Sequence, residues 1–186
     1  LKRDAVAISG SLPLVLRGSA SATSWAPSLG PSASDDTLSR LMDLYAGDAL
    51  LGPALASAIA TNSIASASGL EGMEGKGRRG GPGAYKGLAD AAARLLSAEG
   101  GPAAAVLSFD GWDTHANQGA ANGQLALRLA GLDTALRALR RGLGAHWAKT
   151  VVAVVTEFGR TVAENGTGGT DHGTGSAAFL LGGAVS

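Results

Sequence analysis

The sequence contains no cysteine, no excess of charge of either sign and no long apolar run. Without cysteine there is no disulfide, no thiolate nucleophile and no cysteine-ligated zinc, so any metal must bind through oxygen and imidazole. Fifteen basic and fifteen acidic side chains cancel, which leaves no overall field to attract nucleic acid or an anionic membrane surface. No apolar run approaches the roughly 20 residues that span a bilayer, and no basic, apolar and small-residue signal pattern opens the sequence. We therefore expect neither nucleic-acid binding nor a membrane span.

The sequence does contain enough apolar material for a core. A hydrophobic content of 45% over 186 residues predicts one sizeable core, or part of a larger one, in a soluble globular segment. The sequence begins at Leu1 without an initiator methionine and stops at Ser186 directly after a strand-like run, so we expect both ends to be cuts through a larger domain. We predict one α/β domain fragment over residues 1–186, with strand, helices and loops in 1–100 and a β-α-β unit in 101–186.

The first hundred residues predict short elements joined by loops. Residues 4–18 indicate a strand, a break at Gly10 and Pro13, and a second extended piece, followed by a Ser/Ala/Pro/Gly-rich loop over 19–34. Helices are predicted from about 35, capped by Ser34 or Asp35, from about 48 to 65 despite Pro53, and from about 84 to 98. The glycine-rich connector 71–83 carries three cationic side chains, Lys76, Arg78 and Arg79. They could bind an anionic ligand, or the connector could be a flexible loop whose charges face water.

Two apolar runs flank a long helix in the second half. Residues 103–109 and 150–156 are typical of strands buried on both faces. Between them leucines recur at steps of four and three residues from Leu125 to Leu143, which places them on one helical face. A strand, helix and strand in one sheet make parallel neighbours whose carboxyl ends share an edge, where ligands bind in open α/β sheets. We therefore expect the loops after both strands to lie close together.

The first loop is DGWDTHANQ, residues 110–118. Its carboxylates and imidazole, together with Asn117 and Gln118, suit a divalent-metal half-site for zinc, manganese, magnesium or calcium. The alternative is that Asp110 and Asp113 cap turns and the following helix. We favour capping for Asp110 and a site for Asp113 with His115.

The second loop is EFGRT, residues 157–161. Glu157 at a strand end can ligate a metal or act as a general base, and Arg160 offers a bidentate fork to phosphate, sulfate or carboxylate. The alternative is a structural ion pair between Glu157 and Arg160.

The third loop is NGTGGTDHGTG, residues 165–175. Its glycines let the main chain approach a ligand closely and present Asp171 and His172. A hydrogen-bonded turn is the structural alternative, and no lysine follows at the spacing of a nucleotide-binding loop. His146, beside Trp147 before the second strand, is expected to be a packed or surface histidine on the opposite sheet edge.

Three blocks resemble the uncharacterised exported bacterial proteins known as domain of unknown function 1501. They are GWDTHANQ at 111–118, TEFGRT at 156–161 and NGTGGTDHG at 165–173. Their order, the helix between the first two and the opening AVAISGSLPLVLRG at 5–18 fit the same family. The resemblance spans most of the chain, and its specific part is residues 106–185.

This family is similar to the alkaline phosphatase and sulfatase superfamily, and the resemblance implies its properties. These are a doubly wound, mostly parallel α/β sheet with flanking helices, divalent-metal-dependent hydrolysis of phosphate or sulfate esters, and export to the periplasm through a twin-arginine signal. By the resemblance, five residues match positions at or near the metal centre, namely Asp113, His115, Glu157, Asp171 and His172. Arg160 would contact the substrate or the ligands, with Glu157 and Arg160 in the catalytic roles.

The sequence departs from the superfamily pattern at two places. Superfamily phosphatases place an Asp-His pair after the strand where this chain has Glu157 and Phe158, so an aromatic ring replaces an imidazole. The first strand, an acidic ligand and the nucleophile are expected upstream of Leu1, so we expect this segment alone to be inactive. One hypothesis is therefore a metal-dependent ester hydrolase acting on a small anionic ester. The other is a non-catalytic exported binding or scaffolding module that keeps the fold.

Overall fold

The computed structural model describes residues 5–26, 33–67, 70 and 82–185. The chain divides into two compact units. One comprises Leu1–Lys76 and Ala91–Ser108, and the other comprises Gly77–Asp90 and Phe109–Ser186. The cations Lys76, Arg78 and Arg79 of the glycine-rich connector lie outside the described residues.

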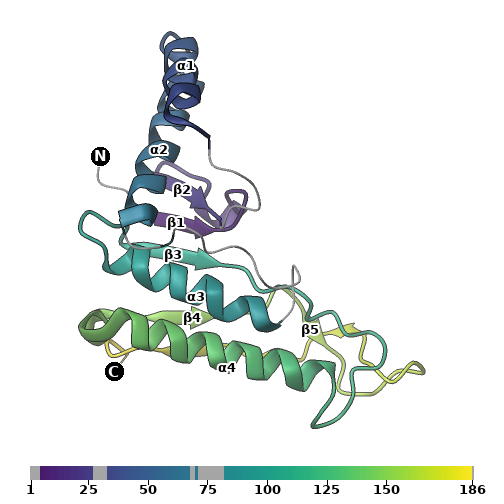
Figure 1. Cartoon of the computed structure of the whole chain (residues 1–186). Helices are drawn as coiled ribbons and strands as arrows, with labels where there is room; N and C mark the ends of the chain where they lie inside the picture. The colour runs from purple at the N-terminus through teal and green to yellow at the C-terminus, as the bar shows by residue number, and fades with distance from the viewer. Residues whose placement is uncertain (1–4, 27–32, 68–69, 71–81, 186) are drawn as a thin grey trace. The chain divides into compact units, whose positions relative to one another are not determined.

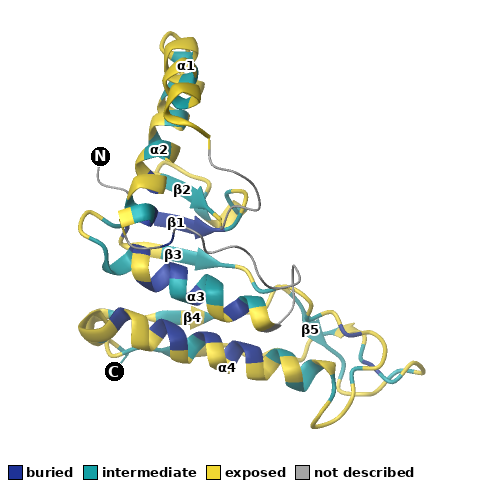
Figure 2. Ribbon diagram, viewed as in Figure 1, coloured by how far each residue is buried: buried dark blue, intermediate teal, exposed yellow. Residues whose placement is uncertain are grey.

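The first unit contains a three-stranded parallel sheet in the order β2-β1-β3 (Figure 1). Its strands are β1 (Ala5–Ile8), β2 (Ala22–Trp25) and β3 (Ala104–Leu107), and Ala5 stands opposite both Ala22 and Ala104. All four residues of β1 are buried, because this strand is paired on both sides, whereas β2 and β3 are partly accessible (Figure 2). The parallel sheet with its helices confirms the predicted α/β class.

Two helices of the first unit begin at side-chain caps. The hydroxyl of Ser34 accepts a hydrogen bond from the backbone of Thr37 at the start of α1 (Asp35–Tyr45), as predicted. A carboxylate oxygen of Asp48 accepts from the backbone of Leu50 and Leu51 at the start of α2 (Leu51–Ala67). Pro53 lies in the first turn of α2, where proline is tolerated because its fixed φ suits the start of a helix, so the predicted helix survives it.

The core of the first unit forms where α2 and the end of α3 (Pro82–Ser97) meet the sheet. A small cavity is lined by Val6 of β1, Thr23 of β2, Thr61 and Ile64 of α2, Leu95 of α3, and Pro102. The buried hydroxyl of Thr61 donates to the carbonyl of Ser57, which satisfies it inside this apolar setting.

The second unit contains α4 (Gln124–Leu143), a 3-10 helix η2 (Gly144–Lys149) and four short strands. The strands pair antiparallel as β4 (Val152–Val154) with β7 (Phe179–Leu181), and as β5 (Gly159–Arg160) with β6 (His172–Gly173). The helix predicted from leucine spacing is confirmed, and its buried face includes Leu132, Leu139 and Leu143 (Figure 2). Leu129 is about half exposed, because Gly131, Ala135 and Ala138 complete the buried stripe instead.

Four expectations about the strands were wrong. The predicted strands at 103–109 and 150–156 correspond to β3 and β4, which belong to different sheets, and β4 pairs antiparallel with β7. Neither β3 nor β4 is buried on both faces. The strand that is fully buried is β1, at the centre of the parallel sheet. β2 lies within the stretch predicted as loop, since pairing with β1 gives it an extended partner. Residues 14–16 form a 3-10 turn, η1 (Leu14–Leu16), rather than an extended piece.

Among the described helices, none combines the length and the apolar character that crossing a membrane requires.

Candidate metal centre

Three side chains of the second unit converge on one point. Nε2 of His115 and Nε2 of His172 each lie 2.9 Å from the same oxygen, Oδ1 of Asp113. One ligand atom from each of the three residues lies within 4.8 Å of the other two, a spacing at which the three could hold one metal ion. The side chains are about half exposed, so the point is open to solvent.

The first loop, residues 110–118, presents alternate side chains to opposite sides. Asp113 and His115 face the convergence point, whereas Thr114 between them is 5% exposed. The hydroxyl of Thr114 donates to Oε1 of Gln118 at 2.8 Å, and the hydroxyl of Thr170 donates to the same oxygen at 2.9 Å. Gln118 therefore ties two loops together beneath the site, a role that its place in the sequence did not reveal.

Arg160 is fixed by the same network. Its Nη1 lies 2.5 Å from Oδ1 of Asp113, its Nε donates to the hydroxyl of Thr170 at 3.0 Å, and its Nη2 lies 3.5 Å from the hydroxyl of Thr114. The ion pair that was the alternative for Arg160, with Glu157, is not formed; Asp113 is its partner. The guanidinium carries five N–H groups, so among the described residues one on Nη1 and one on Nη2 are left for another acceptor.

The glycine loop, residues 165–171, holds the first loop through the backbone. The amides of Asn117 and Gln118 donate to the carbonyls of Thr167 and Gly168, at 3.0 and 2.8 Å. At Gly169 a Cβ would collide with the carbonyl group of His115, so only glycine allows this approach. In the structure, the glycine-rich backbone approaches the first loop closely, whereas its close approach to a ligand stays a prediction.

Asp171 contacts His115 on the side away from Asp113. Its Oδ1 lies 3.1 Å from Nδ1 of His115 and accepts a hydrogen bond from Nδ2 of Asn165 at 2.9 Å. Asn165 also donates to the carbonyl of His115 at 2.9 Å. Asp171, predicted as a metal ligand, thus lies outside the group of three and touches one of its members.

Phe158 packs against the second imidazole. Its ring stacks on that of His172 with centroids 4.5 Å apart and an interplanar angle of 16°. Pairing of β5 with β6 sets Arg160 directly opposite His172, which places both side chains at the site. Phe158 therefore supports a histidine of the group through ring stacking.

Hydrogen bonds lower the pKa of both carboxyls of the cluster. The bond with His172 is the main cause for Asp113, followed by that with Arg160 and the nearby charge of His115. For Asp171 the main cause is the hydrogen bond from Asn165, followed by that with His115. Both pKa values lie below the usual value of about 3.8, so both groups are anionic at neutral pH, as cation binding requires.

The donor set fits a divalent cation. Two imidazoles and one carboxylate, with room for a further ligand, are typical of catalytic zinc sites. Ligand atoms around tetrahedral zinc stand about 3.4 Å apart, given bonds near 2.1 Å. The 2.9 Å separations from Asp113 need to widen by only a few tenths of an ångström to meet this value.

The start of the first loop is held by Tyr85 and Arg128. Tyr85 is 1% exposed, its hydroxyl donates to the carbonyl of Asp110 at 2.5 Å, and its ring stacks on Phe109 with centroids 4.6 Å apart. Arg128 of α4 donates to the carbonyl of Gly111. Neither residue was predicted to support the site, because both lie far from the loop in sequence.

Two polar residues singled out in the sequence are not among the three converging side chains. Glu157 is exposed and, within the described residues, forms no hydrogen bond or ion pair with the three converging side chains. His146 is an exposed residue of η2 whose carbonyl accepts from Thr150, in line with the surface role expected of it.

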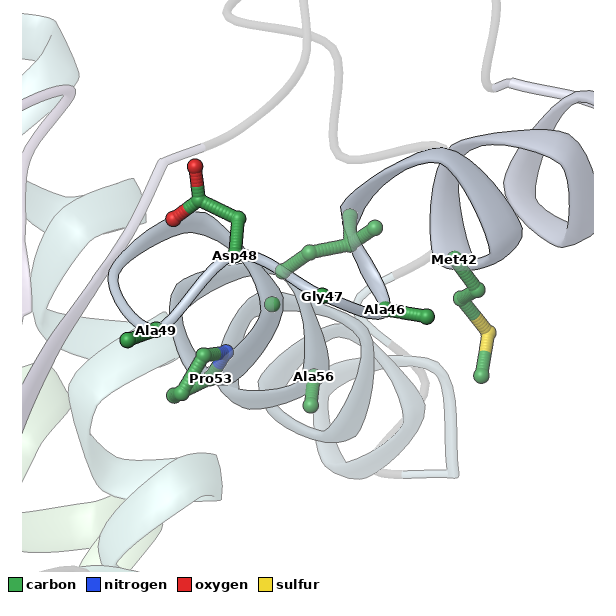
Figure 3. A pocket seen from close by; sticks show the side chains of 9 residues that line it. Met42, Ala46, Gly47, Asp48, Ala49, Pro53 and Ala56 are labelled. Atoms are coloured by element: carbon green, nitrogen blue, oxygen red, sulfur yellow. The ribbon is translucent and has the colours of Figure 1, made fainter.

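A hollow in the first unit, between α1 and α2, is lined by few groups that could catalyse a reaction or bind a metal (Figure 3). It is lined mainly by apolar and small residues, including Met42, Ala46, Pro53 and Ala56. Its titratable member is Asp48, whose carboxylate is occupied by the backbone at the start of α2. The chemistry of the described residues is therefore concentrated in the second unit.

Comparison with known proteins gives one match. The model of a family described as "Protein of unknown function (DUF1501)" matches residues 27–186. Neither a curated protein nor a solved structure gives a significant match. The matched range includes the whole candidate metal centre.

Proposed function

The chain belongs to the DUF1501 family of proteins of unknown function, and we propose that its three converging loops form a divalent-metal site for hydrolysis of phosphate or sulfate esters. The observation that carries this proposal is the approach of Nε2 of His115 and Nε2 of His172 to one oxygen of Asp113. Zinc is the preferred cation, with manganese next, because magnesium and calcium favour all-oxygen sites.

We assign the other steps of ester hydrolysis to residues around the three ligands. Bound there, a divalent cation supplies a Lewis acid for the ester oxygen. Arg160, held in place by Asp113 and Thr170, offers its two remaining Nη hydrogens to the phosphate or sulfate oxygens as charge develops. Glu157, exposed at the entrance of β5, is proposed as the general base that takes a proton from the attacking group.

An anionic ester fits the charge of the centre. A divalent cation and the Arg160 guanidinium together exceed the two anionic carboxylates of Asp113 and Asp171 by one positive charge, so the centre would attract an anionic ester and a monoanion would neutralise it. By the family resemblance, we also propose an alkaline-phosphatase-like fold and export to the periplasm for the full-length protein.

The test measures turnover against metal content. The full-length protein, stripped of metal and reloaded with zinc or manganese, should release p-nitrophenol from its phosphate or sulfate ester. His115→Ala should reduce this rate by more than about 100-fold, since it removes a ligand rather than a partner of a ligand. His146→Ala, which removes a surface imidazole, is the matched control and should turn over normally. Equal rates in the His115→Ala and His146→Ala variants would refute the proposal.

A non-catalytic binding module is the second candidate, and Phe158 is the observation that favours it. An aromatic ring occupies the position expected to supply a further imidazole, so the described residues offer one three-ligand group. Full-length protein that binds one cation tightly and hydrolyses neither ester would favour this alternative.

A further inference from the structure

We propose that Asp171 is a positioning residue, which orients His115 so that Nε2 is the nitrogen offered to the cation. The inference rests on the proposed function, because it concerns the same cation. It replaces the expected role of Asp171 as a ligand with a contact to a ligand.

The two ring nitrogens of His115 face different carboxylates. Nε2 lies 2.9 Å from Asp113, and Nδ1 lies 3.1 Å from Asp171. A cation binds an unprotonated nitrogen, so a neutral imidazole that binds through Nε2 must carry its proton on Nδ1. Asp171 is placed to accept that proton in a hydrogen bond, which favours this tautomer and holds the ring in plane.

Asn165 fixes the carboxylate of Asp171. Its Oδ1 accepts from the backbone amides of Thr167 and Gly169, both at 3.0 Å, so its Nδ2 must be the atom that faces Asp171. Nδ2 then donates both to Asp171 and to the carbonyl of His115, each at 2.9 Å. The carboxylate is thereby tied to the main chain of the histidine that it orients.

The second imidazole is held differently. Within the described residues, Nδ1 of His172 forms no hydrogen bond. Its ring stacks on those of Phe158 and His115, with centroid distances of 4.5 and 5.0 Å. The loss of Asp171 should therefore disturb one ligand and leave the other in place. Removing the Asp171 carboxylate is therefore expected to weaken metal binding without abolishing it.

The experiment measures zinc affinity of the metal-free chain against a chromogenic chelator. Asp171→Ala should weaken zinc binding by about 10- to 100-fold, the usual effect of removing such a partner. Asp171→Asn keeps a neutral acceptor at the same place and should recover part of that loss. Glu164→Ala is the matched control: it removes a nearby carboxylate that, within the described residues, bonds neither histidine, and it should bind within about twofold of the unsubstituted chain.

The outcomes separate this inference from the proposed function. Tight zinc binding by the unsubstituted chain and by Asp171→Ala alike overturns the positioning role and leaves the metal centre standing. Equal losses in Asp171→Ala and Glu164→Ala assign the effect to net charge and also overturn it. An unsubstituted chain that binds no zinc overturns both. If Asp171→Ala does not fold, the comparison of Asp171→Asn with the unsubstituted chain decides, and equal affinity there rejects the inference.

Discussion

The imidazole of His115 stacks on that of His172, with ring centroids 5.0 Å apart and an interplanar angle of 28°. The two residues come from different loops. Those loops are joined by backbone hydrogen bonds that Asn117 and Gln118 donate to the glycine loop and by one that Thr170 donates to the carbonyl of Thr114. Both Nε2 atoms consequently point to one carboxylate oxygen.

Arg160→Ala should destabilise the chain by about 1–3 kcal/mol, because it leaves the hydroxyls of Thr114 and Thr170 without their guanidinium partner. The Arg160 side chain is only 20% exposed, so solvent does not fully replace these contacts. Urea unfolding measures the change. Arg137→Ala breaks an exposed ion pair with Asp133 on α4 and serves as the control, with no resolvable shift of the midpoint. Equal midpoints for the two variants would show that the bonds of Arg160 to Thr114 and Thr170 do not stabilise the fold.

Gly169→Ala should destabilise the chain by about 1–3 kcal/mol and weaken zinc binding, since the added methyl group forces the glycine loop away from His115. Gly166→Ala is the control in the same loop, because a Cβ there meets open space, and its stability should stay within about 0.5 kcal/mol of the unsubstituted chain. Thermal unfolding and the chelator assay measure both effects. A Gly169→Ala variant as stable as Gly166→Ala would show that the two loops are not in close contact.

Tyr85→Phe should cost about 1 kcal/mol, because the carbonyl of Asp110 loses a buried donor. Burial raises the pKa of Tyr85, so ionisation of the phenol opposes folding. The stability that the neutral phenol provides is complete below about pH 10 and is lost as the pH rises through the higher folded-state pKa. Urea midpoints from pH 7 to 11 should therefore fall more steeply for the unsubstituted chain than for Tyr85→Phe. Parallel pH profiles would argue against a buried, hydrogen-bonded phenol.

Asp48 makes the helix content of the first unit depend on pH in the acidic range. Hydrogen bonds from the backbone of Leu51 and Leu50 lower the pKa of Asp48 below its usual value near 3.8. The stabilisation is therefore present above that value and is lost as the pH falls through the lower folded-state pKa. Asp48→Asn keeps an oxygen acceptor at the start of α2 but cannot ionise. The helical circular dichroism of the unsubstituted chain should fall towards that of Asp48→Asn between about pH 4 and 2. A constant difference over this range would contradict the capping role.

Local patterns predicted the helices better than the strands. The leucine spacing of α4 and the Ser34 cap of α1 act within a few residues, so the sequence carries them directly. The identity of a strand's partner is not local. β2 becomes a strand through pairing with β1, and β4 pairs with β7 rather than joining β3 in one sheet. The residues within a strand do not specify which strand it pairs with.

The sequence predicted the three candidate ligands of the site, but not the residues that hold those ligands in place. Asp113, His115 and His172 stood out because carboxylate and imidazole groups lie in glycine-containing loops. They were expected to meet at the edge of a parallel sheet, whereas the loops are joined to each other by their own backbone. Asn165, Gln118 and Thr170 bond to partners about fifty residues away, so only the folded chain assigns them a role.

The central claim is tested most directly by counting the zinc ions that the chain binds. Equilibrium dialysis of the metal-free protein should give one ion per chain, with His146→Ala unchanged and His172→Ala reduced to weak or no binding. A chain that takes up no zinc, or a His172→Ala variant that binds it as tightly as the unsubstituted chain, would contradict the metal centre.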